Sequence, residues 1–122
     1  MTNTYTLYGA QISLFTGKAK AYLTYKNIPF EEVLSTTKVY KKIIEPNTGV
    51  RFIPVVKTPE GEYLQDTSYI IERLEERFPE RPMLPSSPKQ KLTATLFELF
   101  SDEWLVLPAM HYRWNKDNFP YI

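Results

Sequence analysis

The stretch "VRFIPVVKTPEGEYLQDTSYIIERLEERF", residues 50–78, carries the strongest structural signals in the sequence. In its first half, two β-branched and aromatic runs flank "TPEGE", where Pro and Gly favour a turn, so residues 50–64 are predicted to form a β-hairpin. The second half predicts a helix that begins near Asp66 or Thr67 and ends before Pro79. One face of this helix carries the apolar residues Ile70, Ile71, Leu74 and Phe78.

Pro54 lies within the first strand of this hairpin. Because proline has no N–H to give to a strand ladder, we expect it at the first residue of the strand, at an edge or at a bulge. The peptide bond before a proline is also the kind that can adopt the cis form. We therefore expect free backbone groups beside Pro54.

The preceding part of the chain has the pattern of a strand, a helix and a second strand. "TYTLY", residues 4–8, and "FEEVL", residues 30–34, suit strands. Between them an apolar stripe recurs at helical spacing from about Phe15, with Lys18 and Lys26 outside it. The stripe consists of Ala19, Tyr22 and Leu23. A helix that joins two strands in this way forms a right-handed crossover between parallel neighbours.

Two further segments complete the pattern. Val39, Ile43 and Ile44 mark a shorter helix, which we expect to end at the "EPNTG" turn. In "PERPMLPSSP", residues 79–88, proline recurs at every third position, which favours a stiff extended segment. From Lys89 a second apolar stripe predicts a helix to about Met110, with Pro108 forcing a kink or a restart. The C-terminal segment is rich in aromatic residues, namely Trp104, Tyr112, Trp114, Phe119 and Tyr121.

The composition limits the classes of function. The chain has 122 residues and a net charge of +1, so no field favours nucleic acid or an anionic membrane surface. It has no Cys and one His, which excludes disulfides and thiolate metal sites and leaves a histidine-based metal site or triad hard to assemble. We expect no metal. No apolar run approaches the roughly 18 residues of a membrane span, and the N-terminus lacks a leader pattern, so we expect a cytoplasmic protein.

In the order of its elements the sequence resembles the thioredoxin-like N-terminal domain of glutathione S-transferases. Three motifs carry the resemblance, "SLFTGKAKAYLTYKNIPFEEV" (13–33), "FIPVV" (52–56) and "LQDTSYIIERLEERFP" (64–79). The resemblance implies an α/β fold, a thioredoxin-like βαβ-ββα domain with a mixed four-stranded sheet. We expect a glutathione-binding domain over 1–80, a Pro-rich linker over 81–88 and, over 89–122, the first helix of the family's all-helical second domain.

The resemblance also implies a site. In the family, the residue at the position of Ser13 touches the glutathione thiol, so Ser13 is the expected catalytic residue, and Thr16 is a weaker candidate for the same role. Because neither is Cys, exchange through a protein disulfide is excluded. Capping of the helix N-terminus is the alternative role for both hydroxyls.

The remaining expected contacts follow the three charged or polar parts of glutathione. Pro54 resembles the family's cis-proline, which leaves the backbone of Ile53 to pair with the cysteinyl part, although a turn required by the fold is an alternative role. Asp66 would meet the α-ammonium and Thr67 the α-carboxylate; the alternative for Asp66 is the N-cap. The glycine carboxylate needs a donor, and the candidates are Lys38, Lys41, Lys42 and Arg51. The alternative for these lysines is a solvated face.

Two functions remain open at this point. The first is a serine-type glutathione transferase, which takes glutathione as co-substrate, joins its sulfur to a small apolar electrophile and forms a homodimer as relatives do. The second is a non-catalytic glutathione-transferase-like domain that serves binding or protein assembly.

Overall fold

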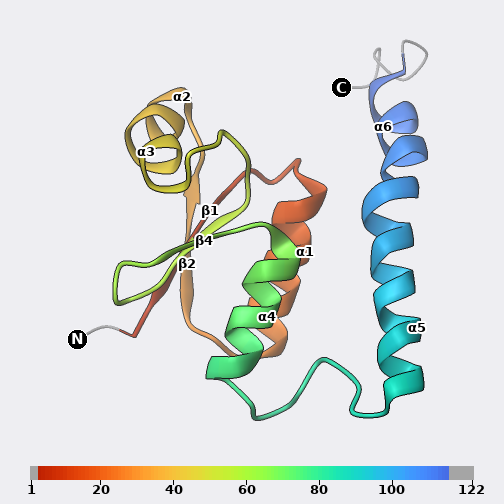
Figure 1. The fold of residues 1–122 in the computed structure, drawn as a ribbon. Helices are drawn as coiled ribbons and strands as arrows, with labels where there is room; N and C mark the ends of the chain where they lie inside the picture. Colours follow the sequence, from red (N-terminus) through yellow and green to blue (C-terminus); the bar gives the residue numbers. More distant parts are fainter. Residues whose placement is uncertain (1–2, 116–122) are drawn as a thin grey trace. The chain divides into compact units, whose positions relative to one another are not determined.

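The computed structural model describes residues 3–115, and the chain divides into two compact units after Arg81. The first unit is built on a four-stranded sheet in the order β2-β1-β3-β4 (Figure 1). β1 (Tyr5–Gly9) pairs in parallel with β2 (Phe30–Leu34) and antiparallel with β3 (Val55–Lys57), which pairs antiparallel with β4 (Tyr63–Gln65). The expected mixed sheet of a thioredoxin-like domain is thereby confirmed.

Two helices cover one face of this sheet. α1 (Leu14–Tyr25) and α4 (Thr67–Arg77) lie side by side in Figure 1. The expected stripe of α1 and the expected face of α4 are buried except for the half-buried Phe78. They pack with strand residues in the larger core cluster, which includes Leu7, Leu23, Val56, Leu64, Ile70 and Leu74. Burial of these side chains on one side of β1 holds the N-terminus of α1 at the end of that strand.

A shorter helical segment covers the opposite face. It consists of α2 (Thr37–Val39), a π-helical turn η1 (Tyr40–Ile44) and α3 (Glu45–Thr48). The smaller core cluster beneath it contains Tyr8, Ile44 and Val55. The prediction that the helix ends at "EPNTG" is wrong, because helical turns continue to Thr48. Pro46 is the second residue of α3, and Gly49 ends the helix at φ 77°.

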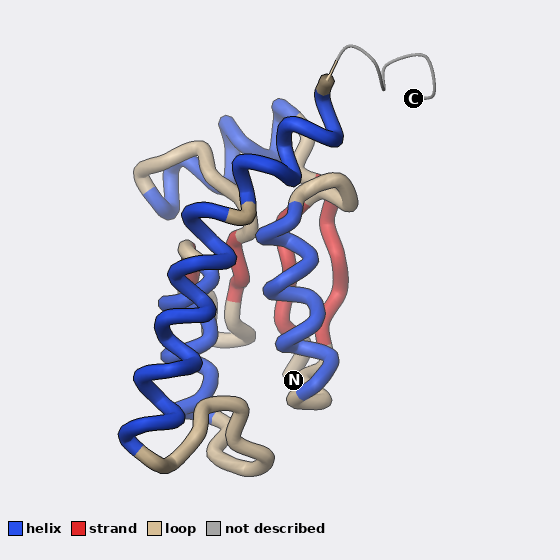
Figure 2. Tube along the Cα trace, turned by 90° about the vertical axis from the view of Figure 1, so that its right-hand side faces the viewer, coloured by secondary structure: helices blue, strands red, loops and turns tan. Residues whose placement is uncertain are grey.

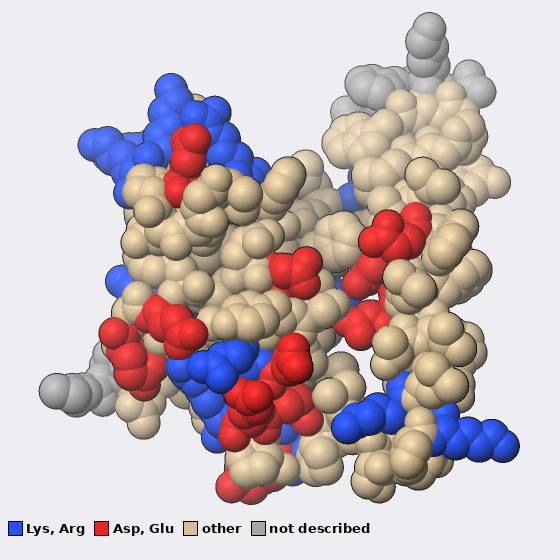
Figure 3. All heavy atoms as spheres, viewed as in Figure 1, with Lys and Arg blue, Asp and Glu red and all other residues tan. Residues whose placement is uncertain are grey.

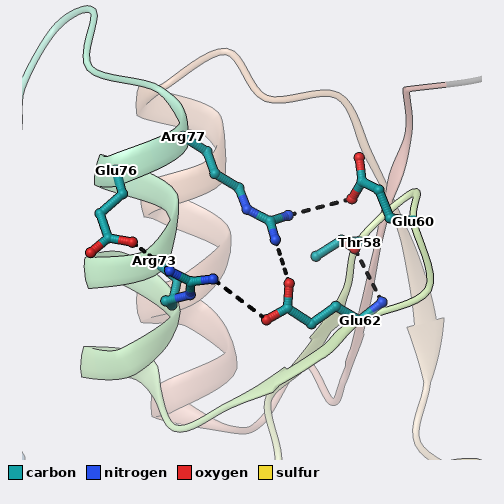
Figure 4. Close-up of polar contacts among 6 residues, drawn as sticks. All are labelled: Thr58, Glu60, Glu62, Arg73, Glu76 and Arg77. Atoms are coloured by element: carbon teal, nitrogen blue, oxygen red, sulfur yellow. Dashed lines mark hydrogen bonds and ion pairs between the residues drawn. The ribbon is translucent and has the colours of Figure 1, made fainter.

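A network of ion pairs joins the β3–β4 hairpin to α4 (Figure 4). Glu62, on the hairpin, pairs with Arg77 and lies 3.9 Å from a guanidinium nitrogen of Arg73. Arg77 also reaches Glu60 at 3.4 Å, and Arg73 pairs with Glu76 at 2.5 Å. Both strands of the hairpin are three residues long, so these pairs supplement a short backbone ladder.

The second unit contains α5 (Pro88–Leu99), a π-helical turn η2 (Phe100–Trp104) and α6 (Val106–Trp114). They form one nearly continuous run of helical turns, interrupted at Leu105 (Figures 1 and 2). The expected restart near Pro108 occurs two residues earlier, at Val106, and the helix extends beyond Met110 to Trp114. Its large exposed apolar side chains include Leu92, Leu96, Phe97, Leu99, Phe100, Trp104, Leu107, Tyr112 and Trp114. Of the aromatic residues expected at the C-terminus, Phe119 and Tyr121 lie outside the described residues.

Candidate functional site

The sheet brings the expected site elements to one of its ends. The antiparallel register sets Tyr8 of β1 opposite Val55 of β3, and Val55 opposite Gln65 of β4. The C-terminal end of β1, the N-terminal end of β3 and the C-terminal end of β4 therefore coincide. Ser13, Pro54 and Asp66 follow or precede these ends within a few residues. Strand pairing thus gathers three segments that are far apart in sequence.

Ser13 is the N-cap of α1 and is partly exposed. Its Oγ accepts a hydrogen bond from the N–H of Thr16 at 3.1 Å, and its own N–H donates to the carbonyl of Ala10 at 2.9 Å. The expected capping role is therefore present. A hydroxyl that accepts one bond keeps its own O–H for another acceptor, so capping leaves this serine able to donate to a ligand. The first turn of α1 contains no acidic residue that would offset its positive end.

Thr16 has a different environment. It is 4% exposed, and its hydroxyl accepts from the N–H of Ala10 at 3.3 Å. A Cβ placed on Gly9 would lie 2.3 Å from Cγ2 of Thr16, so the strand reaches this helix only because residue 9 has no side chain. Thr16 therefore supports the turn that carries Ser13.

The peptide bond between Ile53 and Pro54 is cis. Pro54 is buried directly before β3, while Ile53 is partly exposed and packs against the smaller core cluster. The strand ladder begins at Val55, so the backbone of Ile53 lies beyond the paired residues. Pro54, expected at the first residue of its strand, at an edge or at a bulge, thus lies one residue before the first residue of β3.

Asp66 caps α4 in an uncommon backbone conformation. Its φ of 77° lies in the left-handed region, and its Oδ1 accepts from the N–H groups of Ser68 at 3.0 Å and Tyr69 at 3.4 Å. Backbone strain of this kind is concentrated at ligand sites. Asp66 is exposed, whereas Thr67 is 5% exposed. The Asp66 carboxylate is therefore accessible at this helix end, whereas Thr67 is buried.

Lysine side chains gather over the α2 to α3 segment, at the upper left of Figure 3. Lys38, Lys41 and Lys42 are exposed there. Arg51, the fourth candidate cation, lies 2.7 Å from the carboxylate of Glu45. Arg51 therefore already has an acidic partner, which distinguishes it from the three exposed lysines.

A cavity of about 560 Å³ adjoins the turn that carries Ser13. Its lining consists of Leu7, residues 9–12, Thr16 and residues 32–34. Two large apolar side chains among them, Ile12 and Leu34, are 65% and 64% exposed. The cavity therefore offers apolar surface next to the N-terminus of α1.

Sequence reasoning missed this cavity and its lining residues on β2. The expected strand "FEEVL" gave a signal, because residues two apart on a strand, such as Glu32 and Leu34, share one side. Within residues 3–115, no three metal-ligating side chains cluster, and no helix is long and apolar enough to span a bilayer.

Comparison with known proteins agrees with this geometry. The family model for the N-terminal domain of glutathione S-transferase matches residues 7–82. A glutathione S-transferase from Methylobacterium radiotolerans, solved in complex with glutathione sulfonate, is 29% identical with a TM-score of 0.74; the match covers 81% of this chain and 47% of that one. No match was found among curated proteins.

Two more distant structures share the fold. A Tau class glutathione S-transferase from mango, Mangifera indica, is 22% identical with a TM-score of 0.73, over 82% of this chain and 46% of that one. A glutathione transferase homologue from Sulfitobacter, solved with bound glutathione, is 14% identical with a TM-score of 0.75, over 94% and 58%. This chain thus spans about half the length of these structures. With the sheet order, the cis-proline and a family model that covers more than half of its residues, the chain belongs to the glutathione S-transferase family.

Proposed function

We propose that this chain binds glutathione at the sheet end formed by β1, β3 and β4, and that Ser13 stabilises the glutathione thiolate for conjugation to an apolar electrophile. The observation that carries the proposal is the environment of Ser13. Its oxygen accepts from the N–H of Thr16, so its O–H remains able to donate to a ligand at the positive end of a helix of 12 residues. A sulfur anion is the kind of group that such a position stabilises.

The helix N-terminus and the Ser13 hydroxyl together supply enough stabilisation to lower the pKa of a bound thiol to near neutral pH. Lowering the pKa of a thiol from about 8.5 to about 6.5 requires roughly 2.7 kcal/mol. A helix N-terminus contributes about 0.3 to 2 kcal/mol, and a hydrogen bond to a charged group about 1.5 to 3 kcal/mol. Together the two effects produce a substantial thiolate fraction at neutral pH without a metal or a histidine base.

We also propose partners for the other parts of glutathione. The backbone of Ile53 beside Pro54 would pair with the cysteinyl part as a short antiparallel ladder. The carboxylate of Asp66 would meet the α-ammonium, and the N-terminus of α4 beside Thr67 the α-carboxylate. Lys42 would receive the glycine carboxylate. Thr16 acts in this scheme through the turn, by holding Ala10 and Ser13 in place.

Conjugation needs no further reactant. For an aryl halide, the sulfur forms a bond to the ring carbon, the carbon–halogen bond breaks, and halide leaves with the bonding pair. The thiol proton passes to solvent before the attack. The cavity beside Ile12 and Leu34 would hold the ring, because both side chains present apolar surface there.

The non-catalytic domain remains the second candidate, and one observation favours it. The chain spans about half the length of the solved transferases it matches, so it supplies only part of the surface found in those proteins. We propose that the unit from Pro82 onward begins the family's all-helical second domain, and that the chain pairs as a homodimer. Light scattering measures the second of these claims directly.

Retention on immobilised glutathione tests the binding site. Asp66→Asn keeps an oxygen that can cap α4 but removes the negative charge, so retention is expected to fall about three- to tenfold while stability is unchanged. Equal retention of wild type and Asp66→Asn would contradict the assignment of the α-ammonium to this residue.

The pH dependence of thiolate absorbance in the glutathione complex tests Ser13. Ser13→Ala is expected to raise the apparent pKa of the bound thiol by about 1 to 2 units, because it removes a hydrogen bond to the anion. Ser87→Ala is the matched control, since Ser87 caps α5 in the same way, by accepting from the N–H of Gln90 at 3.2 Å. Binding without turnover of a chromogenic aryl chloride would favour the non-catalytic candidate.

A further inference from the structure

Glu32 brings a carboxylate to the apolar cavity beside Ser13. Among the described residues that line this cavity, Glu32 is the one with a charged side chain. The rest of the lining is apolar or neutral. The Glu32 side chain is 43% exposed, so water screens part of its charge, and we expect its effect on a bound group to be moderate.

The position of Glu32 on the cavity side of β2 follows from its contacts. In the parallel register it lies opposite Leu7, whose side chain packs in the core cluster with α1 and α4. Its Oε1 also lies 2.6 Å from the Nζ of Lys20, which comes from α1. Glu32 therefore projects from the helix-covered face of the sheet. Leu34, two residues further along the strand, shares that face.

We propose that Glu32 is a specificity-determining residue of the electrophile site. It favours electrophiles that carry a cationic or hydrogen-bond-donating substituent and disfavours those that carry an anionic one. This inference rests on the proposed function, since it assumes that the glutathione sulfur lies at Ser13 and that the electrophile occupies the adjoining cavity.

Lys20 does not cancel this effect. Lys20 lies outside the cavity lining, whereas Glu32 is part of it, and water screens the two charges to a similar degree because their side chains are 50% and 43% exposed. The ion pair holds the Glu32 carboxylate in place while a second oxygen or lone pair stays available to a ligand. The expected result is a moderate selection by charge, of about three- to tenfold, as for a unit charge that is partly screened.

Three S-aryl glutathione conjugates test the inference on the 122-residue chain by calorimetry. Their para substituents are a carboxylate, a carboxamide and an aminoethyl amide, so the glutathione part is identical and the charge of the substituent is negative, neutral and positive in turn. The extra length of the aminoethyl group is the same in wild type and variant, so the change in the binding ratio between the two proteins reports the effect of the Glu32 charge. Wild type is expected to bind the aminoethyl conjugate about three- to tenfold more tightly than the carboxylate conjugate. Glu32→Gln, which keeps the shape of the side chain, is expected to reduce this ratio to near one.

Glu31→Gln is the matched control. It makes the same change in charge one residue earlier on β2, where Glu31 is exposed and accepts from the hydroxyl of Thr6 at 3.3 Å. It is expected to leave the ratio as in wild type. A Glu32→Gln variant that keeps the wild-type ratio, or that weakens all three conjugates equally, would overturn the inference. If wild type fails to bind glutathione itself, the proposed function fails and the inference with it.

Discussion

The ammonium of Lys26 lies 2.9 Å from the Oε1 of Glu75, and the Lys26 side chain has no exposed surface. The same ammonium donates to the carbonyl oxygens of Phe78, Glu80 and Arg81 at 2.5, 2.9 and 3.2 Å. Phe78 is the C-cap of α4, so Lys26 satisfies carbonyl groups that the helix itself leaves unpaired. One buried cation therefore joins the end of α1 to the end of α4.

Lys26→Met is expected to destabilise the protein by about 3 kcal/mol, because it leaves the carboxylate of Glu75, which is only 12% exposed, without its cation. The control is Lys20→Met, which breaks an exposed pair and is expected to cost about 1 kcal/mol or less. Urea unfolding followed by far-ultraviolet circular dichroism measures both. Equal losses for the two variants would contradict the role given to Lys26.

We expect the protein to lose stability in alkali because the hydroxyl of Tyr22 is buried and hydrogen-bonded. Burial raises the pKa of its hydroxyl above the usual range, and the hydrogen bond that it donates to Glu75 at 2.8 Å raises that pKa further. A raised folded-state pKa gives stability that is fully present below the unfolded pKa of about 10 and is lost as the pH rises above it. We expect a stability plateau up to about pH 10 and a decline beyond.

Tyr22→Phe tests this assignment. It is expected to cost about 1 kcal/mol at neutral pH, through the lost hydrogen bond, and to make the alkaline decline shallower. A decline remains, because burial also raises the pKa of Tyr8 and of Tyr40. Parallel curves for wild type and variant, from urea unfolding between about pH 9 and 11, would show that Tyr22 does not contribute.

Gly9 predicts a steric effect at the turn that carries Ser13. Gly9→Ala places a Cβ 2.3 Å from Cγ2 of the buried Thr16, so it is expected to cost about 1 to 3 kcal/mol and to weaken glutathione binding. Thr16→Ala in the same chain should recover part of the stability. Gly17→Ala is the control: its Cβ meets nothing within 4 Å, and in a helix it should stabilise by about 0.5 to 1 kcal/mol. A Gly9→Ala protein as stable as wild type would refute the close approach.

The pairing of Glu62 with two arginines predicts a dependence on salt. Glu62→Gln should destabilise the hairpin by about 1 kcal/mol at low ionic strength and less at high salt, because the side chain is partly exposed. Glu60→Gln is the comparison. It should have the smaller effect, because Glu60 pairs with Arg77 but not with Arg73. Thermal unfolding at two salt concentrations distinguishes these outcomes.

The positions of β2 and β3 and the N-cap of α4 could be predicted from local signals. The run "FEEVL" places β2 correctly, and the proline before "VV" marks the start of β3. Asp66 is recognisable as an N-cap because short polar side chains accept from the first N–H groups of a helix. These signals involve residues close together in sequence, so no tertiary information is needed.

The features that sequence reasoning missed depend on distant partners. Lys26 lies outside the apolar stripe of its helix, yet it is buried because its acceptors come from residues 75–81. The cavity near Glu32 likewise exists only after β2 is placed beside the turn at residues 9–12. The continuation of the helix past Ile44 required a π-helical turn, for which the sequence carries no local signal.

The π-helical turn η2 determines in which direction the side chains of α6 point around the helix axis, relative to those of α5. A π turn takes up one residue more than an α turn, which offsets every later side chain by about 100° around the axis. Deletion of one residue between Phe100 and Trp104 would therefore rotate the side chains of Leu107, Tyr112 and Trp114 about the helix axis by more than a quarter of a turn. The helical segment would become only slightly shorter. Removing or inserting one residue in this turn therefore changes which aromatic side chains lie on the same face of the helical segment, without any change in the sequence of the first unit.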